Sequence, residues 1–458
     1  MEEEDEVQIE ERIKESGYKG SFPQTEEEAN AVDDLLANEL AELSLLEQDK
    51  ATFDLHGIST EIEETEELIE SSLKEMEKEI HNIKKKPAFE KAVKLNPNYV
   101  NSRQFRIRFL RCEFFKCKNA AKRLVFHFEK KEVLFGDGEV LGRDVHLSDL
   151  SSPQDIEHVK SGGIQVLPTR DIAGRSVLLW MPGNFKGKKY ILKSTQRLFY
   201  YVVDSASREE ETQKKGFVTV FWNIGPRGMP PTIALFKNLH AIRLAMPHRM
   251  CGLHFCFDYK ALRPMVSGMR YFMDKHARKR FRVHYGDEQK VAFQLQTYGI
   301  PFDDGSPMKV INGQFNLTWH QNWLQLRQAQ EGGSTDQKQR ITIPHRFDVL
   351  FGRGNNAREH TGNLRATHLV NMHQKNYDEA NRFAKTSISE KLVGIIKESG
   401  GKFLKWEDSG WVEVEDDIAR DKVSHWFRLN RQKGNQKEAS VETQKQKRPF
   451  NQTLESSS

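Results

Sequence analysis

A run of apolar side chains stands at three- and four-residue spacing within the helix predicted for residues 260–276. The run consists of Leu262, Met265, Val266, Met269, Phe272 and Met273. This spacing places the side chains on one face of a helix. Methionine adapts its shape easily, which suits the wall of a chamber for a variable apolar ligand, although ordinary core packing is the commoner cause of the pattern. The chemistry that this face offers is non-covalent binding of an apolar molecule.

Two clusters of cations accompany this face. The cluster that follows the helix directly includes Lys275, Arg278, Lys279 and Arg280, and the second cluster consists of Lys186, Lys188, Lys189 and Lys193. A charge cluster is usually a solvated surface. An apolar wall that ends in cations, however, is what a phospholipid requires of its binding site.

Residue patterns for catalysis are missing from the sequence. It contains no G-x-S-x-G and no H-E-x-x-H motif, and residues 183–188 are one residue short of a phosphate-binding loop. Several histidines crowd the region of the predicted strands, but no serine, cysteine or carboxylate stands in a recognisable nucleophile arrangement. We therefore predict no catalytic residues and no cofactor, and we do not expect an enzyme.

The cysteines lack the spacing of a metal site. Cys112 and Cys117 are five residues apart on a predicted helix, as are Cys251 and Cys256 on a predicted strand. Five residues leave two helical side chains about 140° apart, and an odd separation places two strand residues on opposite faces. Because neither pair can converge on one ion, we predict buried cysteines and no metal site.

The elements that carry these residues alternate in type. The predicted strands cover residues 176–181, 217–223, 249–257 and 281–285, and the helices between them cover residues 190–207, 233–245 and 260–276. This order predicts an α/β fold with a mixed or mainly parallel sheet and right-handed crossovers. Apolar residues at helical spacing before it predict a helical N-terminal lobe, so that residues 96–302 form one domain.

Charge is divided unevenly along the chain. Residues 1–80 carry 27 acidic and 6 basic side chains, a net charge of −21, whereas residues 81–343 have a net charge of +21. A basic body implies an anionic partner, which could be a phospholipid surface, nucleic acid or the acidic arm itself. The arm could compete with a membrane for the body, or it could only keep the protein soluble.

The first 86 residues divide into two segments. Residues 1–58, acidic and poor in aromatic side chains, are predicted to be disordered. Within them, Leu36, Leu40 and Leu43 stand at helical spacing, which indicates a transient helix or a helix that docks on a partner. Residues 59–86 repeat apolar side chains at every seventh position, which predicts an amphipathic helix or a short coiled coil with a protein partner.

A second folded unit is predicted for residues 344–431, after a linker at residues 303–343. It should contain two helices, a hairpin and a third helix, with a capping box from Ser387 to Glu390. The tail at residues 432–458 is polar and is predicted to be disordered.

This unit provides the alternative function of a nucleic-acid-binding regulator. A winged-helix-like binder would use Arg353, His360 and Arg365 as phosphate contacts. Residues 344–431 have a net charge of only +2, and this argues against nucleic acid as a partner because DNA-binding domains are usually strongly basic.

Composition restricts the location of the protein. The sequence has no run of about 18 apolar residues, which a membrane-spanning helix would need. Its first residues are acidic, unlike a signal or transit peptide, and four cysteines are too few for a disulfide framework. We expect a cytoplasmic protein that acts at membrane surfaces, with the nucleus as an alternative location.

Several short segments occur in a specific order and at specific spacings within residues 96–302. They are 108–111 (RFLR), 119–121 (NAA), 171–177 (DIAGRSV), 246–250 (MPHRM), 263–264 (RP) and 298–301 (YGIP). In this order they resemble the segments of the CRAL-TRIO lipid-binding family. The resemblance implies an α/β lipid-binding domain whose gate is the helix at residues 260–276.

The resemblance also implies site residues. His248 stands where phosphatidylinositol binders of the family have glutamate, and Arg280 stands where they have lysine, so these two residues would contact the lipid headgroup. The implied lipid chamber consists of Leu262, Met265, Met269, Phe272 and Met273. The implied membrane-surface cations are Lys186, Lys188, Lys189, Lys275, Arg278 and Lys279. The expected function is non-catalytic intracellular lipid binding or transfer, with a phospholipid or another hydrophobic ligand.

The C-terminal unit carries a second set of segments. They are 348–354 (DVLFGRG), 360–363 (HTGN), 400–404 (GGKFL) and Trp411. Residues 344–431 thereby resemble an uncharacterised domain common in algal proteins, a resemblance that implies no function.

Overall fold

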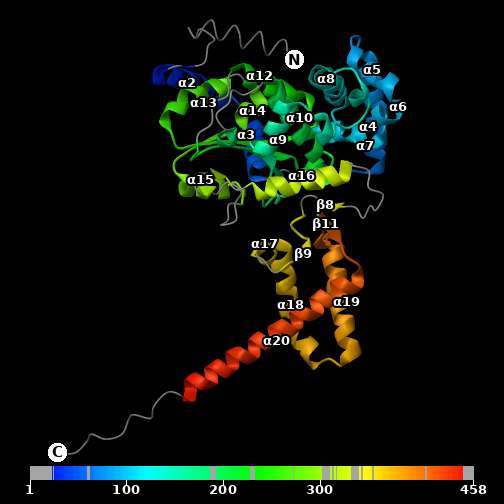
Figure 1. The fold of residues 1–458 in the computed structure, drawn as a ribbon, viewed down its shortest axis with the longest axis vertical. Helices are drawn as coiled ribbons and strands as arrows, with labels where there is room; N and C mark the ends of the chain where they lie inside the picture. The colour runs from blue at the N-terminus through cyan, green and yellow to red at the C-terminus, as the bar shows by residue number, and fades with distance from the viewer. Residues whose placement is uncertain are drawn as a thin grey trace, which may run out of the picture. The chain divides into compact units, whose positions relative to one another are not determined.

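The computed structural model describes residues 23, 25–58, 62–185, 192–226, 233–271, 273–301, 310–311, 314–315, 317–331, 340–341, 344–352, 355–407 and 410–446. The chain divides into two units, residues 1–333 and residues 334–458, and each is described by itself (Figure 1). Of the residues singled out above, Lys186, Lys188, Lys189, Phe272 and Arg353 lie outside the described residues.

A five-stranded sheet forms the centre of the first unit, with the strand order β1-β2-β3-β4-β5. Its strands are β1 (Ile164–Val166), β2 (Ser176–Trp180), β3 (Phe217–Asn223), β4 (Met250–Phe257) and β5 (Phe281–Tyr285). The last four are parallel, and β1 pairs with β2 antiparallel. The mixed, mainly parallel α/β sheet predicted from the sequence is confirmed. Strand β1 was not predicted from the sequence, because its three residues are too few to show a strand pattern.

Helices connect the parallel strands and pack on one face of the sheet. They are η3 (Pro182–Asn184), α10 (Leu192–Ala206) and α11 (Glu210–Lys215) between β2 and β3, α12 (Ile233–Ala245) between β3 and β4, and η4 (Lys260–Leu262), α13 (Arg263–Tyr271) and α14 (Lys275–Lys279) between β4 and β5. Successive strand residues point to opposite faces. Phe255 and Phe257 of β4 therefore pack with α13, whereas Cys256 packs with Val291 of α15 (Glu288–Gln296).

A helical lobe precedes the sheet. It comprises α4 (Glu66–Asn82), α5 (Pro87–Leu95), α6 (Pro97–Val100), α7 (Arg103–Cys112), α8 (Cys117–Phe135) and η1 (Glu139–Gly142). Phe105, Phe109 and Phe128 form an edge-packed aromatic core, and Met76 and Ile80 of α4 pack into the same cluster. The apolar repeat predicted for residues 59–86 thus packs α4 against α8 within the lobe (Figure 1).

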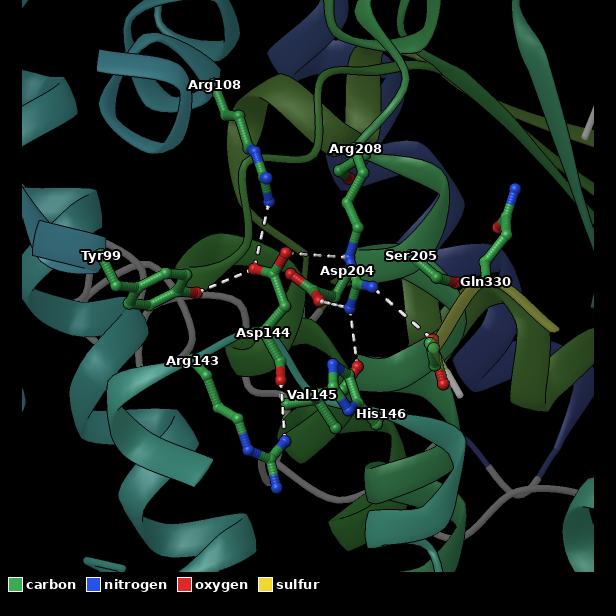
Figure 2. A network of polar contacts seen from close by, with 12 residues as sticks. Tyr99, Arg108, Arg143, Asp144, Val145, His146, Asp204, Ser205, Arg208 and Gln330 are labelled. Atoms are coloured by element: carbon green, nitrogen blue, oxygen red, sulfur yellow. Dashed lines mark hydrogen bonds and ion pairs between the residues drawn. The ribbon is translucent and has the colours of Figure 1, made fainter. Parts of the chain in front are cut away.

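A polar network joins this lobe to α10 (Figure 2). The Tyr99 hydroxyl donates a hydrogen bond to Asp144 at 2.9 Å, and Arg208 lies 3.4 Å from the same carboxylate. Arg208 also donates to the carbonyl of Val145 at 2.6 Å. Burial acts to raise the pKa of Asp144, but the positive charges of Arg208 and Arg108 outweigh it and hold that pKa below its usual value. The network therefore fixes the lobe against the sheet domain through paired, largely buried charges.

Part of the predicted linker belongs to the first unit. The elements η2 (Leu147–Asp149) and α9 (Pro153–Ser161) precede the sheet, and the short strands β6 (Val310–Ile311) and β7 (Gln314–Phe315) follow it. Helix α16 (Thr318–Glu331) comes next and packs against the rest of the first unit. Trp323 and Leu326 are buried, and Glu331 accepts a hydrogen bond from the backbone N–H of Leu147 at 2.6 Å. Because these partners are distant in sequence, local composition alone did not reveal the packing of this helix.

Two helices replace part of the disorder predicted for residues 1–58. They are α2 (Glu26–Ala41) and α3 (Leu45–His56). Ser44 begins α3 with a capping box to Glu47, and Gly57 ends it in the left-handed conformation with φ of 68°. Leu36 is buried on α2, so the apolar spacing noted in the sequence belongs to a docked helix. Residues 1–22 lie outside the described residues.

The second unit has a four-stranded sheet with the order β8-β11-β10-β9. Its elements are β8 (Arg340–Ile341), β9 (Val349–Phe351), α17 (Asn355–Glu359), α18 (Thr361–Glu379), α19 (Arg382–Glu398), β10 (Phe403–Glu407), β11 (Gly410–Glu413) and α20 (Asp416–Gln446). The three long helices α18, α19 and α20 and the β10–β11 hairpin were predicted, whereas α17 was not. Asn381, not Ser387, caps α19, and α20 continues through residues 432–446, where the sequence predicted disorder.

The DVLFGRG and HTGN segments of this unit hold its sheet to α18. The Asn363 side chain donates to the carbonyl of Leu350 at 2.9 Å and accepts from the N–H of Leu350 at 2.6 Å, as a neighbouring strand would. Asp348 accepts from the N–H of Lys402 at 2.8 Å. A Cβ at Gly362 would lie 1.9 Å from the carbonyl oxygen of Asp348. These segments therefore have structural roles in the unit.

Gly362→Ala should destabilise the second unit by about 1–3 kcal/mol, because the added methyl group overlaps the backbone of Asp348. Gly394→Ala is the matched control, since a Cβ there meets no atom within 4 Å and alanine favours the interior of α19. Urea unfolding of both variants measures the difference. Equal urea midpoints for the two variants would contradict the close approach of Gly362 to the backbone of Asp348.

Candidate functional site

Helix α13 presents an apolar face to the sheet. Val266 and Met269 are buried against Phe255 and Phe257 of β4 and Phe281 of β5. The same cluster includes the buried Met273, with Leu262 and Met265 half-buried at its edge. The chamber residues that the structure describes are thus brought together, and in this conformation they form a closed apolar layer.

The opposite face of α13 is polar and is covered by the acidic helix α2, which lies beside it in Figure 1. Asp33 of α2 accepts hydrogen bonds from Ser267 at 3.1 Å and from Arg270 at 3.0 Å, and it lies 3.5 Å from Arg263. Asn30 accepts a further hydrogen bond from Arg263 at 2.7 Å. One turn of α2 therefore engages the polar groups along α13.

The three predicted membrane-surface cations that the structure describes lie together on α14. Arg278 donates to Glu39 of α2 at 2.7 Å, and Lys279 pairs with Glu47 of α3 at 2.8 Å. Lys275 is exposed. Two of these three cations are thus paired with carboxylates of the acidic arm.

Arg280 is buried and is paired with Asp54 of α3. Its Nε donates to Asp54 Oδ2 at 2.9 Å, and its second amino group donates to the same oxygen. Arg249 lies 3.4 Å from the other carboxylate oxygen. Arg175 of the DIAGRSV segment donates to the carbonyl of Leu55 at 3.0 Å, so the C-terminal end of α3 is anchored by three arginines.

His248 lies in a different environment from Arg280. Its ring packs on Phe217, with the ring centroids 4.5 Å apart, and neither ring nitrogen has a hydrogen-bond partner among the described residues. Burial, with a smaller contribution from the charge of Arg243, lowers the pKa of His248 to about 3. The imidazole is therefore neutral at pH 7.

The two best-formed crevices among the described residues are small. One lies between α2 and α14 beside Leu36 and Lys275, and the other lies beside Arg111 and Phe114, with volumes of about 10 and 20 Å³. Each has room for about one water molecule, whereas ligand pockets enclose roughly 300–1,000 Å³. Neither crevice could hold a lipid in this conformation.

The predicted phosphate contacts of the second unit have other partners. Burial lowers the pKa of His360 to about 4, and its ring accepts a hydrogen bond from the N–H of Gly362 at the start of α18. The guanidinium of Arg365 lies over the ring of Phe347 at 4.7 Å. The contacts of these two residues do not favour a nucleic-acid interface.

Sequence reasoning did not find the acidic partners at this site. Asp33, Glu39 and Asp54 are scattered over 22 residues with no motif, and their arginine partners follow more than 190 residues later. The opposite net charges of the arm and the body were the one signal, and they pointed to contact without indicating its residues.

A helical lobe, a mainly parallel sheet and an amphipathic helix over one sheet face make this an α/β domain with an apolar layer beneath α13. Residues 160–299 match the CRAL/TRIO domain, and residues 348–429 match a domain of unknown function (DUF6824). No curated protein matches the chain at a significant level. The chain thus carries a CRAL/TRIO domain, of a family that binds and transfers lipids, and a second domain without an assigned role.

The match to the CRAL/TRIO domain begins at α9 and ends after α15, so the helical lobe lies outside it. Among the described residues, none of the helices is both long enough and apolar enough to cross a bilayer.

Proposed function

We propose that the CRAL/TRIO domain holds a phospholipid non-covalently between α13 and the sheet, without chemical turnover, and exchanges it at membrane surfaces in the cytoplasm. The observation that carries this proposal is the apolar layer in which Met269 of α13 packs on Phe255 of β4, inside residues that match this lipid-binding family. When two apolar surfaces separate, they leave one continuous chamber, and an acyl chain replaces the lost contacts.

Helix α13 is suited to be the moving part. It has only nine residues, and Gly268 lies in its middle, where glycine costs a helix about 1 kcal/mol relative to alanine. The contacts that Val266 and Met269 make with the sheet are apolar, so separating them from the strands breaks no hydrogen bond. Methionine side chains can then repack around an acyl chain of variable shape.

The headgroup site in this proposal lies at α14. A phosphate binds most strongly to charge-assisted donors such as guanidinium groups. Arg278 stands at the end of the apolar layer and binds the carboxylate of Glu39, and Arg280 beside it adds positive charge while it stays bound to Asp54. His248 is not part of this site, because a neutral imidazole contributes no charge to phosphate binding.

Met265→Lys should reduce lipid uptake by at least about tenfold, because the half-buried side chain would bring an ammonium group to the edge of the chamber. The lysine can snorkel to solvent in the closed state, so the fold should persist. Native mass spectrometry of the full-length protein after incubation with phosphatidylcholine and phosphatidylserine vesicles measures the bound lipid.

Met372→Lys is the matched control, because Met372 of the second unit is 65% exposed and lies far along the chain from α13. It should take up lipid as the wild type does. No lipid on the wild-type protein from either kind of vesicle would refute the proposed function. Equal uptake by both variants would refute the assignment of the chamber.

A further inference from the structure

Helix α2 is acidic and binds α13, the proposed moving helix, through both apolar and polar side chains. Its apolar contact consists of Val32 and Leu36 against Tyr271, with Leu35 at the edge. It also makes polar contacts with α13 and α14, through Asn30, Asp33 and Glu39. The interface therefore combines a small apolar contact with ion pairs and hydrogen bonds.

The ion pairs of this interface are only partly buried. The side chain of Asp33 is 28% exposed, and those of its partners Arg263 and Arg270 are 42% and 20% exposed, whereas the Arg278–Glu39 pair is more buried, at 9% and 15%. Ion pairs in contact with water are weak and are screened by salt. The crevice beside Leu36 and Lys275 also shows that α2 does not fill the surface that it covers.

Helix α3, in contrast, is anchored. Asp54 and its neighbours bind buried arginines, and a Cβ at Gly57 would lie 2.1 Å from that of Ala173, which shows how tightly the chain passes there. Residues 42–44 separate α3 from α2. This arrangement lets α2 leave its place while α3 keeps it tethered close by, at a high local concentration.

The groups that α2 binds are those that an anionic lipid would bind. The carboxylates of Asp33 and Glu39 accept hydrogen bonds from the guanidinium groups of Arg270 and Arg278, as phosphate oxygens would. Asp33 also binds Ser267 in the middle of α13, so any movement of α13 relative to α2 breaks these bonds.

We propose that α2 is a removable acidic lid that keeps α13 closed, and that an anionic lipid surface displaces it by competing for Arg263, Arg270 and Arg278. This inference rests on the proposed function, since it assigns the regulation of the same site. Contact with an anionic membrane would expose the cations and free α13 in one step, so the domain would open where its ligand is found.

The test compares two double variants of the full-length protein. Asp33→Ala with Glu39→Ala removes the lid contacts, whereas Glu27→Ala with Asp34→Ala removes the same charge from exposed positions of the same helix. Vesicles of phosphatidylcholine with about 30% phosphatidylserine should bind the first variant at least about tenfold more tightly than the wild type. The control variant should differ from the wild type by less than about twofold.

Amide hydrogen exchange gives a second measurement. The backbone N–H groups of α13 should exchange faster in the lid variant than in the control variant, and those of β4 should not change. In the wild type, added salt should speed exchange in α2 while β4 stays protected, so the lid can be tested without a substitution.

Equal vesicle affinity and equal exchange of α13 in the two variants would overturn the lid. Equal tightening by both variants would also overturn it, because net charge alone would then explain the effect. Lipid uptake is measured separately: a lid variant that binds vesicles tightly but never carries a lipid would refute the chamber and leave the lid standing.

Discussion

Asp54→Ala should lower the free energy of unfolding of the first unit by about 3–5 kcal/mol. The Asp54 carboxylate is buried and accepts two hydrogen bonds from Arg280, with Arg249 3.4 Å away. Its removal leaves a buried guanidinium group without its counter-charge. Urea unfolding followed by tryptophan fluorescence measures the loss, since Trp180 and Trp222 are buried in this sheet.

Asp49→Ala is the control for this prediction, because Asp49 lies on the same helix and is exposed. It should change the free energy of unfolding by less than about 0.5 kcal/mol. Asp54→Asn keeps the shape and removes the charge, so it should resemble Asp54→Ala rather than the wild type. If Asp54→Ala and Asp49→Ala were equally stable, α3 would not be the anchor that Arg175, Arg249 and Arg280 imply.

Stability should fall steeply between pH 7 and pH 5.5. Among the described residues of the first unit, burial lowers the pKa of five buried histidines. They are His127, His248, His254, His284 and His320. Their pKa in the unfolded chain is about 6.5, so below that pH the unfolded state binds more protons and is favoured. The stabilisation is complete above about pH 6.5 and is lost as the pH falls toward the folded-state values.

The size of this effect follows from linkage. A histidine with a folded-state pKa of about 3, such as His248, loses up to about 1.4 kcal/mol of stabilisation for each pH unit below 6.5. Several such groups should lower the free energy of unfolding by several kcal/mol at pH 5.5. Urea unfolding at constant ionic strength across this range measures the slope.

His248→Phe should make that slope shallower by about 1.4 kcal/mol per pH unit, because phenylalanine cannot bind a proton. Neither ring nitrogen of His248 has a hydrogen-bond partner among the described residues, and its ring packs on Phe217, so the phenyl ring should also be tolerated at pH 7. His81→Phe, at the exposed end of α4, is the control and should leave the slope unchanged. An unchanged slope in His248→Phe would show that His248 is accessible to protons in the fold.

Much of the fold could be predicted because its signals are local. The runs SVLLW, FVTVFWN and MCGLHFCF are apolar and buried on both faces, which is typical of parallel strands between helices. The stripe from Leu262 to Met273 identified the helix over the sheet, and the order of the short segments around it pointed to the CRAL/TRIO family. Both depend on neighbours within a few residues of each other.

The contacts of the predicted cations could not be found in the same way. Arg278, Lys279 and Arg280 are consecutive in the sequence and were grouped as one basic cluster. In the structure, Arg278 and Lys279 belong to polar surfaces that α2 and α3 cover, whereas Arg280 is buried with Asp54. Burial depends on what the rest of the chain places over a residue, and neither composition nor spacing contains that information.

The periodicity of apolar residues and the amino-acid composition were enough to indicate a parallel α/β sheet, a helical lobe, a separate C-terminal unit and an acidic arm next to a basic body. Tertiary structure alone decided that the arm folds into α2 and α3, that Asp33 and Glu39 bind α13 and α14, and that His248 is neutral. The physical reason is the range of the interactions. Periodicity arises from backbone geometry within a few residues, whereas ion pairs and desolvation depend on which distant segments meet.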